Sequence, residues 1–136
     1  MIVADTNTIA YLYLPSDYSD DVEAVLLKDP QWIAPFLWRS ELRNILTLYL
    51  RKKLITMSDA ADIQQQAEAL LIDNEYQVSS LEVLQTAHEF GCSAYDAEFI
   101  VLARDTNCQL VTADKKILKA FPEIATSARN FVASGF

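Results

Sequence analysis

The sequence has little glycine, because only Gly91 and Gly135 occur among its 136 residues. Glycine-rich phosphate-binding loops need several glycines, since the backbone must come very close to the phosphate. The scarcity excludes both the GxGxxG dinucleotide-binding motif and the Walker loop. Any phosphate chemistry in this chain must therefore use side chains or metal ions.

Histidine and cysteine are also scarce. His88 is the single histidine, so it cannot build a zinc site, and no Ser/His/Asp or Cys/His set surrounds it. We expect a structural or surface role for it. Cys92 and Cys108 form no CxxC pair and have no histidines at metal-ligand spacing. We expect both to be buried as small hydrophobic residues.

Long apolar runs and an excess of positive charge are missing as well. No run approaches the roughly 20 residues of a membrane helix, and the N-terminus has no basic segment or cleavage site. We therefore expect a cytoplasmic protein with no signal peptide. The net charge of −8 argues against a general nucleic-acid binder. Nine of the eleven positive charges nevertheless fall in two windows, read as solvated helix faces or as a local phosphate-binding rim: Arg39, Arg43, Arg51, Lys52 and Lys53, then Arg104, Lys115, Lys116 and Lys119.

The length predicts one domain, residues 1–136, in which strands and helices alternate. Strands are predicted at 1–4, 31–34, 76–79 and 108–113, with a short fifth strand within 125–132. Helices are predicted at 6–14, 18–28, 36–54, 59–73, 81–90, 94–106 and 115–121. The expected caps are Asp17 or Ser19, Ser58, the pair Ser79 and Glu82, and Ser93, with Gly91 ending one helix.

This alternation predicts an α/β fold with a mostly parallel sheet covered by helices on both faces. Sites in such sheets lie beyond the C-terminal ends of the strands. Asp5 directly follows the first strand and Asp114 closely follows the fourth. If those strands are neighbours, about 4.8 Å apart, the two carboxylates lie side by side at the sheet edge.

Two further acids begin helices. Asp96 lies in the first turn of its helix, where the helix dipole alone favours an acid. Glu41 borders the apolar stripe of the long helix, although an exposed glutamate there is the simpler interpretation. Glu98 is predicted to be a surface residue, because two helical positions after Asp96 correspond to a rotation of about 200°.

Four acids at convergent element ends are the oxygen ligands that Mg²⁺ or Mn²⁺ prefers. A divalent ion held by Asp5, Glu41, Asp96 and Asp114 polarises a phosphoryl oxygen and activates water. The pattern therefore predicts metal-dependent hydrolysis of phosphodiesters.

The same residues carry a family resemblance. The segments "MIVADTN", "WRSELRNIL" with Glu41, "SAYDAEFIVLA" and "LVTADKK" resemble the signature segments of PIN domains. More narrowly, they resemble the compact VapC-type toxins of bacterial and archaeal toxin–antitoxin pairs. The resemblance covers essentially the whole chain in length, order and spacing.

The resemblance implies a doubly wound parallel sheet of five strands in the order 3-2-1-4-5. It also implies a Mg²⁺- or Mn²⁺-dependent endoribonuclease, a homodimer, and an antitoxin whose C-terminal segment lies over the active site. By position, Asp5, Glu41, Asp96 and Asp114 match the family's acidic metal site, and Asn7 and Thr112 match its supporting polar positions. Arg43, Lys115 and Lys116 are candidate contacts for RNA or antitoxin.

Several alternatives remain open from the residues alone. Asn7 is also a plausible helix cap, and Thr112 an ordinary threonine at a strand end. Two other classes are excluded: a haloacid-dehalogenase-like phosphatase needs an acid where Asn7 stands, and a receiver domain needs an aspartate after a central strand, which the segment "YQVSS" does not supply. A catalytically inactive PIN-like interaction module and a housekeeping nuclease without an antitoxin are the remaining alternatives.

Overall fold

The computed structural model describes residues 1–135 and contains a five-stranded parallel sheet in the order β3-β2-β1-β4-β5. The strands are β1 (Ile2–Ala4), β2 (Trp32–Pro35), β3 (Glu75–Tyr76), β4 (Leu110–Val111) and β5 (Ala125–Thr126). All four strand pairs are parallel. The predicted fold class and strand order are confirmed.

β1 is the centre of the sheet. Val3 pairs with Ile33 on one side and with Leu110 on the other. Every residue of β1, β2 and β4 is buried, which explains why these strands are continuous apolar runs without alternation. Since β1 and β4 are neighbours, the chain segments that follow them begin at the same edge of the sheet.

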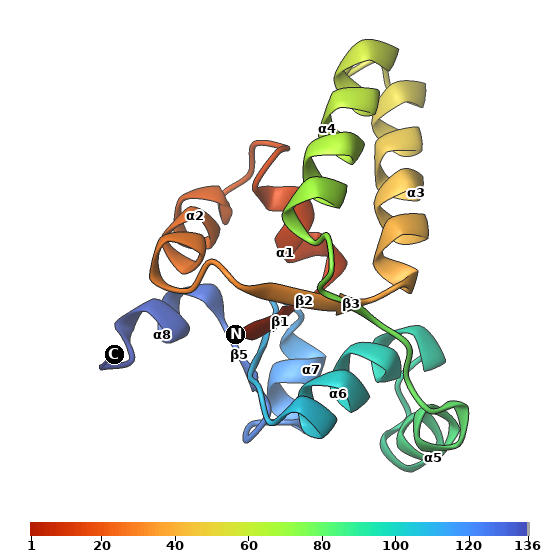
Figure 1. Ribbon diagram of the computed structural model, residues 1–136, viewed down its shortest axis with the longest axis vertical. Coiled ribbons are helices and arrows are strands. Elements are labelled where there is room, and N and C mark those ends of the chain that lie inside the picture. Colours follow the sequence, from red (N-terminus) through yellow and green to blue (C-terminus); the bar gives the residue numbers. More distant parts are fainter. Residues whose placement is uncertain (136) are drawn as a thin grey trace.

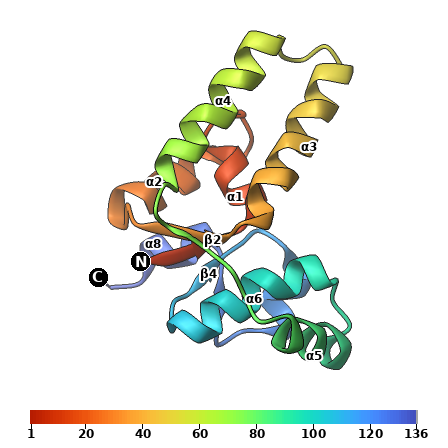
Figure 2. The ribbon, with the colours of Figure 1, turned by 45° about the vertical axis from the view of Figure 1, so that its right-hand side comes forward.

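Helices cover both faces of this sheet (Figures 1 and 2). They are α1 (Thr6–Tyr11), α2 (Ser19–Lys28), α3 (Leu37–Arg51), α4 (Met57–Leu70), α5 (Ser80–Phe90), α6 (Ala94–Thr106), α7 (Lys115–Ala120) and α8 (Ala128–Ala133). The first four lie on one face, where α3 and α4 form a hairpin that projects away from the sheet. On the other face lie α6 and α7, with α5 packed against α6, while α8 packs beside α2. Within residues 1–135, no helix is both long enough and apolar enough to cross a membrane.

Three predicted helix boundaries, the two ends of α5 and the start of α6, are confirmed by their capping residues. Gly91 ends α5 in the left-handed conformation with φ of 67°, which costs glycine little because it has no Cβ. The Ser93 hydroxyl accepts a hydrogen bond from the backbone N–H of Asp96 and so caps α6. The Ser79 hydroxyl likewise accepts from the N–H of Glu82.

Other predicted boundaries were wrong. The α4 cap is Thr56 and not Ser58, because Thr56 and Asp59 form a reciprocal capping box. Neither Asp17 nor Ser19 caps α2, whose N-cap residue Tyr18 makes no side-chain cap bond. The Ser19 hydroxyl instead donates to the Tyr11 carbonyl.

Several element bounds also differ from the prediction, including those of the first helix, the third strand and the fifth strand. The first helix ends at Tyr11, because the N–H groups of residues 12–14 bond to Ile9 and Ala10 in a closing turn. The third strand occupies Glu75–Tyr76, earlier than the predicted 76–79. The fifth strand is only Ala125–Thr126, and the rest of the predicted segment forms α8.

The beginning of α3 is fixed to β3 by an ion-pair network. The Arg39 guanidinium donates to both Glu75 carboxylate oxygens, at 2.6 and 2.7 Å, and to Glu68 at 2.9 Å. The buried Trp38 indole donates to Glu75 at 2.8 Å. Arg39 is therefore neither part of a solvated helix face nor part of a phosphate-binding rim. Its ion pairs fix the start of α3, the helix that carries Glu41.

Candidate active site

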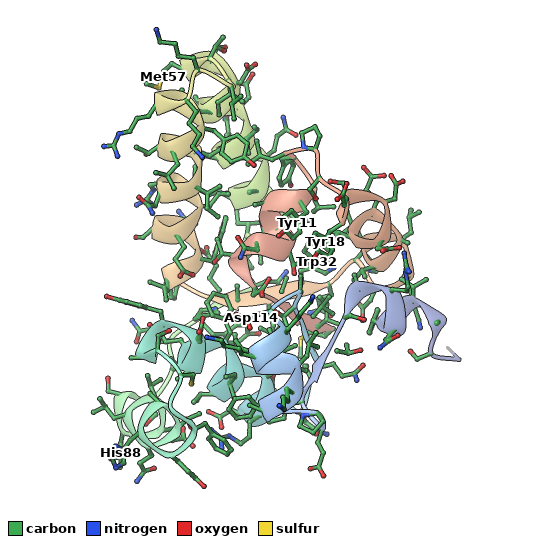
Figure 3. All side chains as sticks on the ribbon, turned by 180° about the vertical axis from the view of Figure 1, so that it is seen from behind. Tyr11, Tyr18, Trp32, Met57, His88 and Asp114 are labelled. Atoms are coloured by element: carbon green, nitrogen blue, oxygen red, sulfur yellow. The ribbon has the colours of Figure 1, made fainter. Side chains whose placement is uncertain are left out.

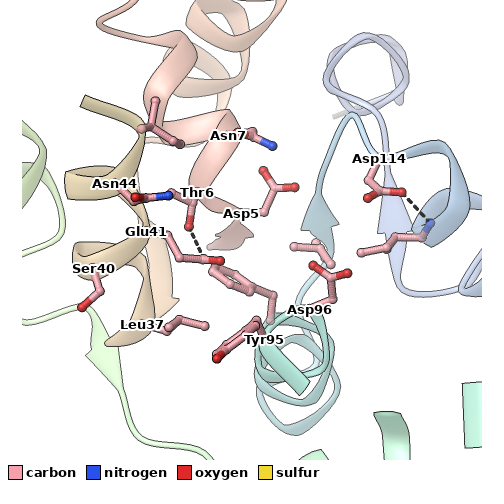
Figure 4. Close-up of a pocket in the computed structure, with 14 residues that line it drawn as sticks. Asp5, Thr6, Asn7, Leu37, Ser40, Glu41, Asn44, Tyr95, Asp96 and Asp114 are labelled. Atoms are coloured by element: carbon pink, nitrogen blue, oxygen red, sulfur yellow. Dashed lines mark hydrogen bonds between the residues drawn. The ribbon is translucent and has the colours of Figure 1, made fainter. Parts of the chain in front are cut away.

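A cavity of about 420 Å³ opens where β1 and β4 end, and we call it the acid cavity (Figure 4). Its described lining contains no lysine, arginine or histidine. The sequence-predicted residues that line it are Asp5, Asn7, Glu41, Asp96 and Asp114. The fold thus brings four carboxylates from four separate chain segments to one concave surface without a lining cation to compensate them.

Asp5 is held at both carboxylate oxygens. Its Oδ1 accepts the backbone N–H of Thr8 at 2.9 Å, so Asp5 is the N-cap of α1. Its Oδ2 accepts the Thr112 hydroxyl at 2.5 Å. Burial raises the pKa of Asp5 and the charge of Asp114 adds to that rise, while the hydrogen bonds from Thr112 and Thr8 oppose it.

Thr112 links the two strand-end acids. Its hydroxyl donates to Asp5 and accepts the backbone N–H of Asp114 at 3.1 Å. Asp114 then caps α7, because its Oδ1 accepts the N–H groups of Lys116 and Ile117 at 2.9 and 3.2 Å. Within the described residues, Oδ2 of Asp114 accepts no hydrogen bond. Thr112 is therefore more than an ordinary strand-end threonine.

Glu41 faces the acid cavity from α3. Its Oε1 accepts the Thr6 hydroxyl at 2.7 Å. Burial raises the pKa of Glu41 despite this hydrogen bond, and the charges of Asp96, Asp5 and Glu98 raise it further. The simpler interpretation of an exposed glutamate is wrong, because the side chain is half-buried among other acids.

Asp96 lies in the first turn of α6 and lines the acid cavity. Burial raises the pKa of Asp96, the Ser93 hydrogen bond opposes that rise, and the charge of Asp114 adds to it. A carboxylate stabilised only by a helix N-terminus would have a lowered pKa. The net effect of the surroundings on the Asp96 charge is therefore unfavourable.

Asn7 and Glu98 line different cavities. Asn7 is exposed and lines the acid cavity, and since Asp5 caps α1, the capping role considered for Asn7 is wrong. Glu98 is half-buried and lines a neighbouring cavity with Phe36 and Tyr76. It is not a lining residue of the acid cavity, although its charge raises the pKa of Glu41.

The candidate basic contacts do not form one patch. Arg43 is exposed on α3 and lines none of the described cavities. Lys115 faces a cavity bordered by α1 and α2, whereas Lys116 faces a small cavity that contains Cys92, Asp96 and Asp114. The two lysines therefore face different cavities.

The scarce residues stand apart from this site. His88 is exposed on α5, far from Asp114 in Figure 3, as the sequence predicted. Cys92 and Cys108 are free thiols and only half-buried, so the expectation of full burial was wrong. Both pack against the hydrophobic core at its margin.

Sequence reasoning missed several lining residues, among them Thr6, Asn44 and Tyr95. Thr6 is buried and supplies the hydrogen bond to Glu41. Asn44 follows Glu41 by three positions, a spacing that places both on one helix face. Tyr95 lines the cavity although 63% of its surface is exposed. The spacing of Asn44 was an available signal, whereas Thr6 and Tyr95 had none beyond adjacency to an acid.

The donor set fits a divalent cation of the Mg²⁺ type. Asp5, Glu41 and Asp96 have raised pKa values in which neighbouring carboxylates take part, so a cation here relieves repulsion. Within residues 1–135, no three such side chains stand close enough to enclose an ion together. Mg²⁺ suits this arrangement, because it keeps several waters and takes one or two protein carboxylates.

Comparison with known proteins places this fold and site in a family. The chain belongs to the PIN domain family, which it matches over residues 2–124. It is also similar to Ribonuclease VapC3 of Pyrobaculum aerophilum, with 25% identity over 129 residues that cover 92% of this chain and 98% of that protein. The resemblance seen in the four acidic segments is confirmed.

Proposed function

We propose that the protein is a Mg²⁺- or Mn²⁺-dependent endoribonuclease that hydrolyses RNA phosphodiester bonds. The observation that carries this proposal is the acid cavity, where four carboxylates converge with no lining cation. Membership of the PIN domain family and similarity to a protein named as a ribonuclease support it. Phosphodiester hydrolysis needs an electrophilic cation near the phosphate and a site for activated water, and the cavity offers room for both.

Each acid has a distinct part in this proposal. Asp5, Asp96 and Asp114 would supply oxygen ligands to the ion, directly or through metal-bound waters, and the bound ion would polarise a phosphoryl oxygen and lower the pKa of water. Glu41 completes the metal site and also accepts a proton from the attacking water, because a carboxylate of raised pKa is the better base.

The supporting residues orient these acids and the substrate. Thr6 and Thr112 fix one oxygen each of Glu41 and Asp5 through hydroxyl donors. Asn7, which lines the cavity without a capping duty, is placed to bind a metal-bound water or a phosphate oxygen. Lys115 and Lys116 provide positive charge in the two cavities that they face.

We further propose that this nuclease is the cytoplasmic toxin of a type II toxin–antitoxin pair and works as a homodimer. The similarity to a VapC protein supports the toxin assignment. Exposed apolar side chains, Phe36, Tyr76 and Leu84, border the neighbouring cavity and offer a surface for a second copy. A short upstream gene whose product inhibits cleavage would identify the antitoxin.

The decisive experiment is cleavage of a folded RNA with Mg²⁺, with EDTA, and by two variants. The Asp114→Asn variant should lose activity at least 100-fold. The Asp105→Asn variant is the control and should keep its activity, because Asp105 is an exposed acid near the end of α6. Activity that persists in EDTA contradicts the metal mechanism. Absence of cleavage by wild type with either metal, together with tight binding to a protein partner, favours the inactive interaction module.

A further inference from the structure

A second cavity, of about 410 Å³, lies between the α1–α2 segment and the α7–α8 segment, and we call it the tyrosine cavity. Tyr11 and Tyr18 form part of its wall, and Lys115 and Arg129 stand on its other side. It shares no lining residue with the acid cavity. The roles proposed above for the four acids leave this cavity without a function.

Only one layer of hydrogen-bonded groups separates the two cavities. Thr8 and Thr112 line the tyrosine cavity, and the same two residues hold the Asp5 carboxylate, through a backbone N–H and a hydroxyl respectively. The charge of Asp5 also contributes, after burial, to the raised pKa of Tyr11. Because both threonines line the tyrosine cavity and hydrogen-bond to Asp5, this cavity lies directly beside a carboxylate of the acid cavity.

The aromatic wall is preassembled. The rings of Tyr11 and Tyr18 are stacked, with centroids 5.1 Å apart and an interplanar angle of 26°, and Figure 3 shows them side by side across the sheet edge from Asp114. Tyr18 keeps 45% of its surface exposed. An exposed ring held rigid by a second ring is the arrangement on which single-stranded nucleic acids stack their bases.

The charges of the two cavities suit different parts of a nucleotide. The acid cavity is lined by four carboxylates, so it accepts a phosphate only together with cations. In the tyrosine cavity, Asp17 and Asp21 balance Lys115 and Arg129. The guanidinium of Arg129 lies 3.6 Å from Asp21 and is 82% exposed. A neutral, planar group fits this balanced site better than an anion does.

We propose that the tyrosine cavity is a nucleobase subsite for single-stranded RNA. It takes the base of a nucleotide next to the scissile phosphate, stacked on Tyr18, while Lys115 contacts the phosphate of that nucleotide. This inference rests on the proposed RNA cleavage and adds to it a binding site for one unpaired base, which has to turn outward to reach the Tyr18 ring.

The test combines an abasic scan of the RNA with substitution of Tyr18. Binding of a short fluorescent single-stranded RNA is measured in Mg²⁺ with the Asp114→Asn variant, so that the RNA stays intact. Each nucleotide in turn is replaced by an abasic one. Tyr18→Ala or Tyr18→Phe is then added to the Asp114→Asn protein. Leu27→Ala is the control, because it removes a large exposed side chain of α2 that does not line the cavity.

One abasic position is expected to weaken binding about 10-fold to 100-fold, the range of a base stacked on an aromatic ring. The Tyr18→Ala substitution should weaken binding of the intact RNA by the same factor as the abasic replacement does. It should not weaken binding of the abasic RNA any further. Tyr18→Phe and Leu27→Ala should bind like the parent protein. Removal of the ring and removal of the base should thus cost the same affinity only once. A variant that is merely unfolded would instead bind every RNA more weakly.

Three results overturn the inference: no abasic position matters, the losses from Tyr18→Ala and the abasic nucleotide multiply, or Tyr18→Ala impairs binding of an antitoxin peptide and leaves RNA binding unchanged. The last result assigns the cavity to a protein partner. Cleavage by wild type is assayed separately, so a protein that binds the base as expected but cuts no RNA refutes the proposed function alone.

Discussion

Replacing Asp96 by asparagine tests whether the acid cavity is a metal site, because it removes one negative charge and keeps nearly the same shape. Ser93, and not the Asp96 side chain, caps α6, so the helix start remains intact. Burial and the charge of Asp114 raise the pKa of Asp96. A charged group with a raised carboxyl pKa opposes folding at neutral pH, and the neutral variant should therefore melt at a higher temperature in EDTA.

The effect of metal on the same pair of proteins has a definite size. Free Mg²⁺ at one hundred times its dissociation constant stabilises wild type by about 2.7 kcal/mol. For a chain of 136 residues, this corresponds to an increase of about 9 °C in Tm. Asp96→Asn should gain much less from Mg²⁺ and lose most of its activity, because one ligand oxygen no longer carries charge.

Asp59→Asn is a matched control. Asp59 occupies the same third position of α4 that Asp96 occupies in α6, but its hydrogen bonds with Thr56 lower its pKa. The same substitution should therefore lower Tm slightly in EDTA and leave the Mg²⁺ shift unchanged. Melting curves of the three proteins with and without Mg²⁺ decide the matter. A Mg²⁺ shift of wild-type size in Asp96→Asn would refute the assignment of this residue to a metal site.

Three further outcomes are expected. Carboxyl groups with raised pKa values bind extra protons in the folded state above their unfolded pKa of about 4, so the Tm in EDTA should fall as pH rises from 5 to 7. Saturating Mg²⁺ should remove most of this slope, and a flat EDTA profile contradicts the argument. Thr112→Val should lower stability by about 1–3 kcal/mol and Mg²⁺ affinity about 10-fold to 100-fold, with Thr112→Ser restoring both in melting and titration assays. Lys115→Ala and Lys116→Ala should each reduce the salt slope of RNA binding by about one, and an unchanged slope assigns that lysine to the solvated helix surface.

The parts of the site that sequence predicted are those set by local pattern. Asp5 and Asp114 follow strands whose apolar residues are contiguous, and Asp96 follows a serine cap at the expected distance. Glu41 was placed at the border of a helical apolar stripe, but the sequence favoured an exposed side chain, and its half-buried position was not predicted. Joining these segments required only the rule that parallel strands end at a common edge.

The contacts that sequence could not predict connect distant segments. Thr6 and Glu41 are 35 positions apart, and Thr112 and Asp5 are 107 apart. The third strand was misplaced because its two residues are not fully buried and carry no apolar run. The different directions of Lys115 and Lys116 follow from the roughly 100° rotation between consecutive helical residues, but their surroundings depend on the assembled fold.

The hydrogen-bond donors around Asp5 and Glu41 explain how the fold accommodates four acids at the edge of its hydrophobic core. A lysine or arginine beside Asp5 or Glu41 would lower the carboxyl pKa values and stabilise the fold without metal. It would also occupy the position of a divalent cation and cancel the charge that attracts one. Threonine hydroxyls donate a hydrogen bond to each of these carboxylates and leave its negative charge in place. The site therefore has oriented acids with uncompensated charge, and under the proposed metal mechanism a bound cation restores the stability that this charge costs.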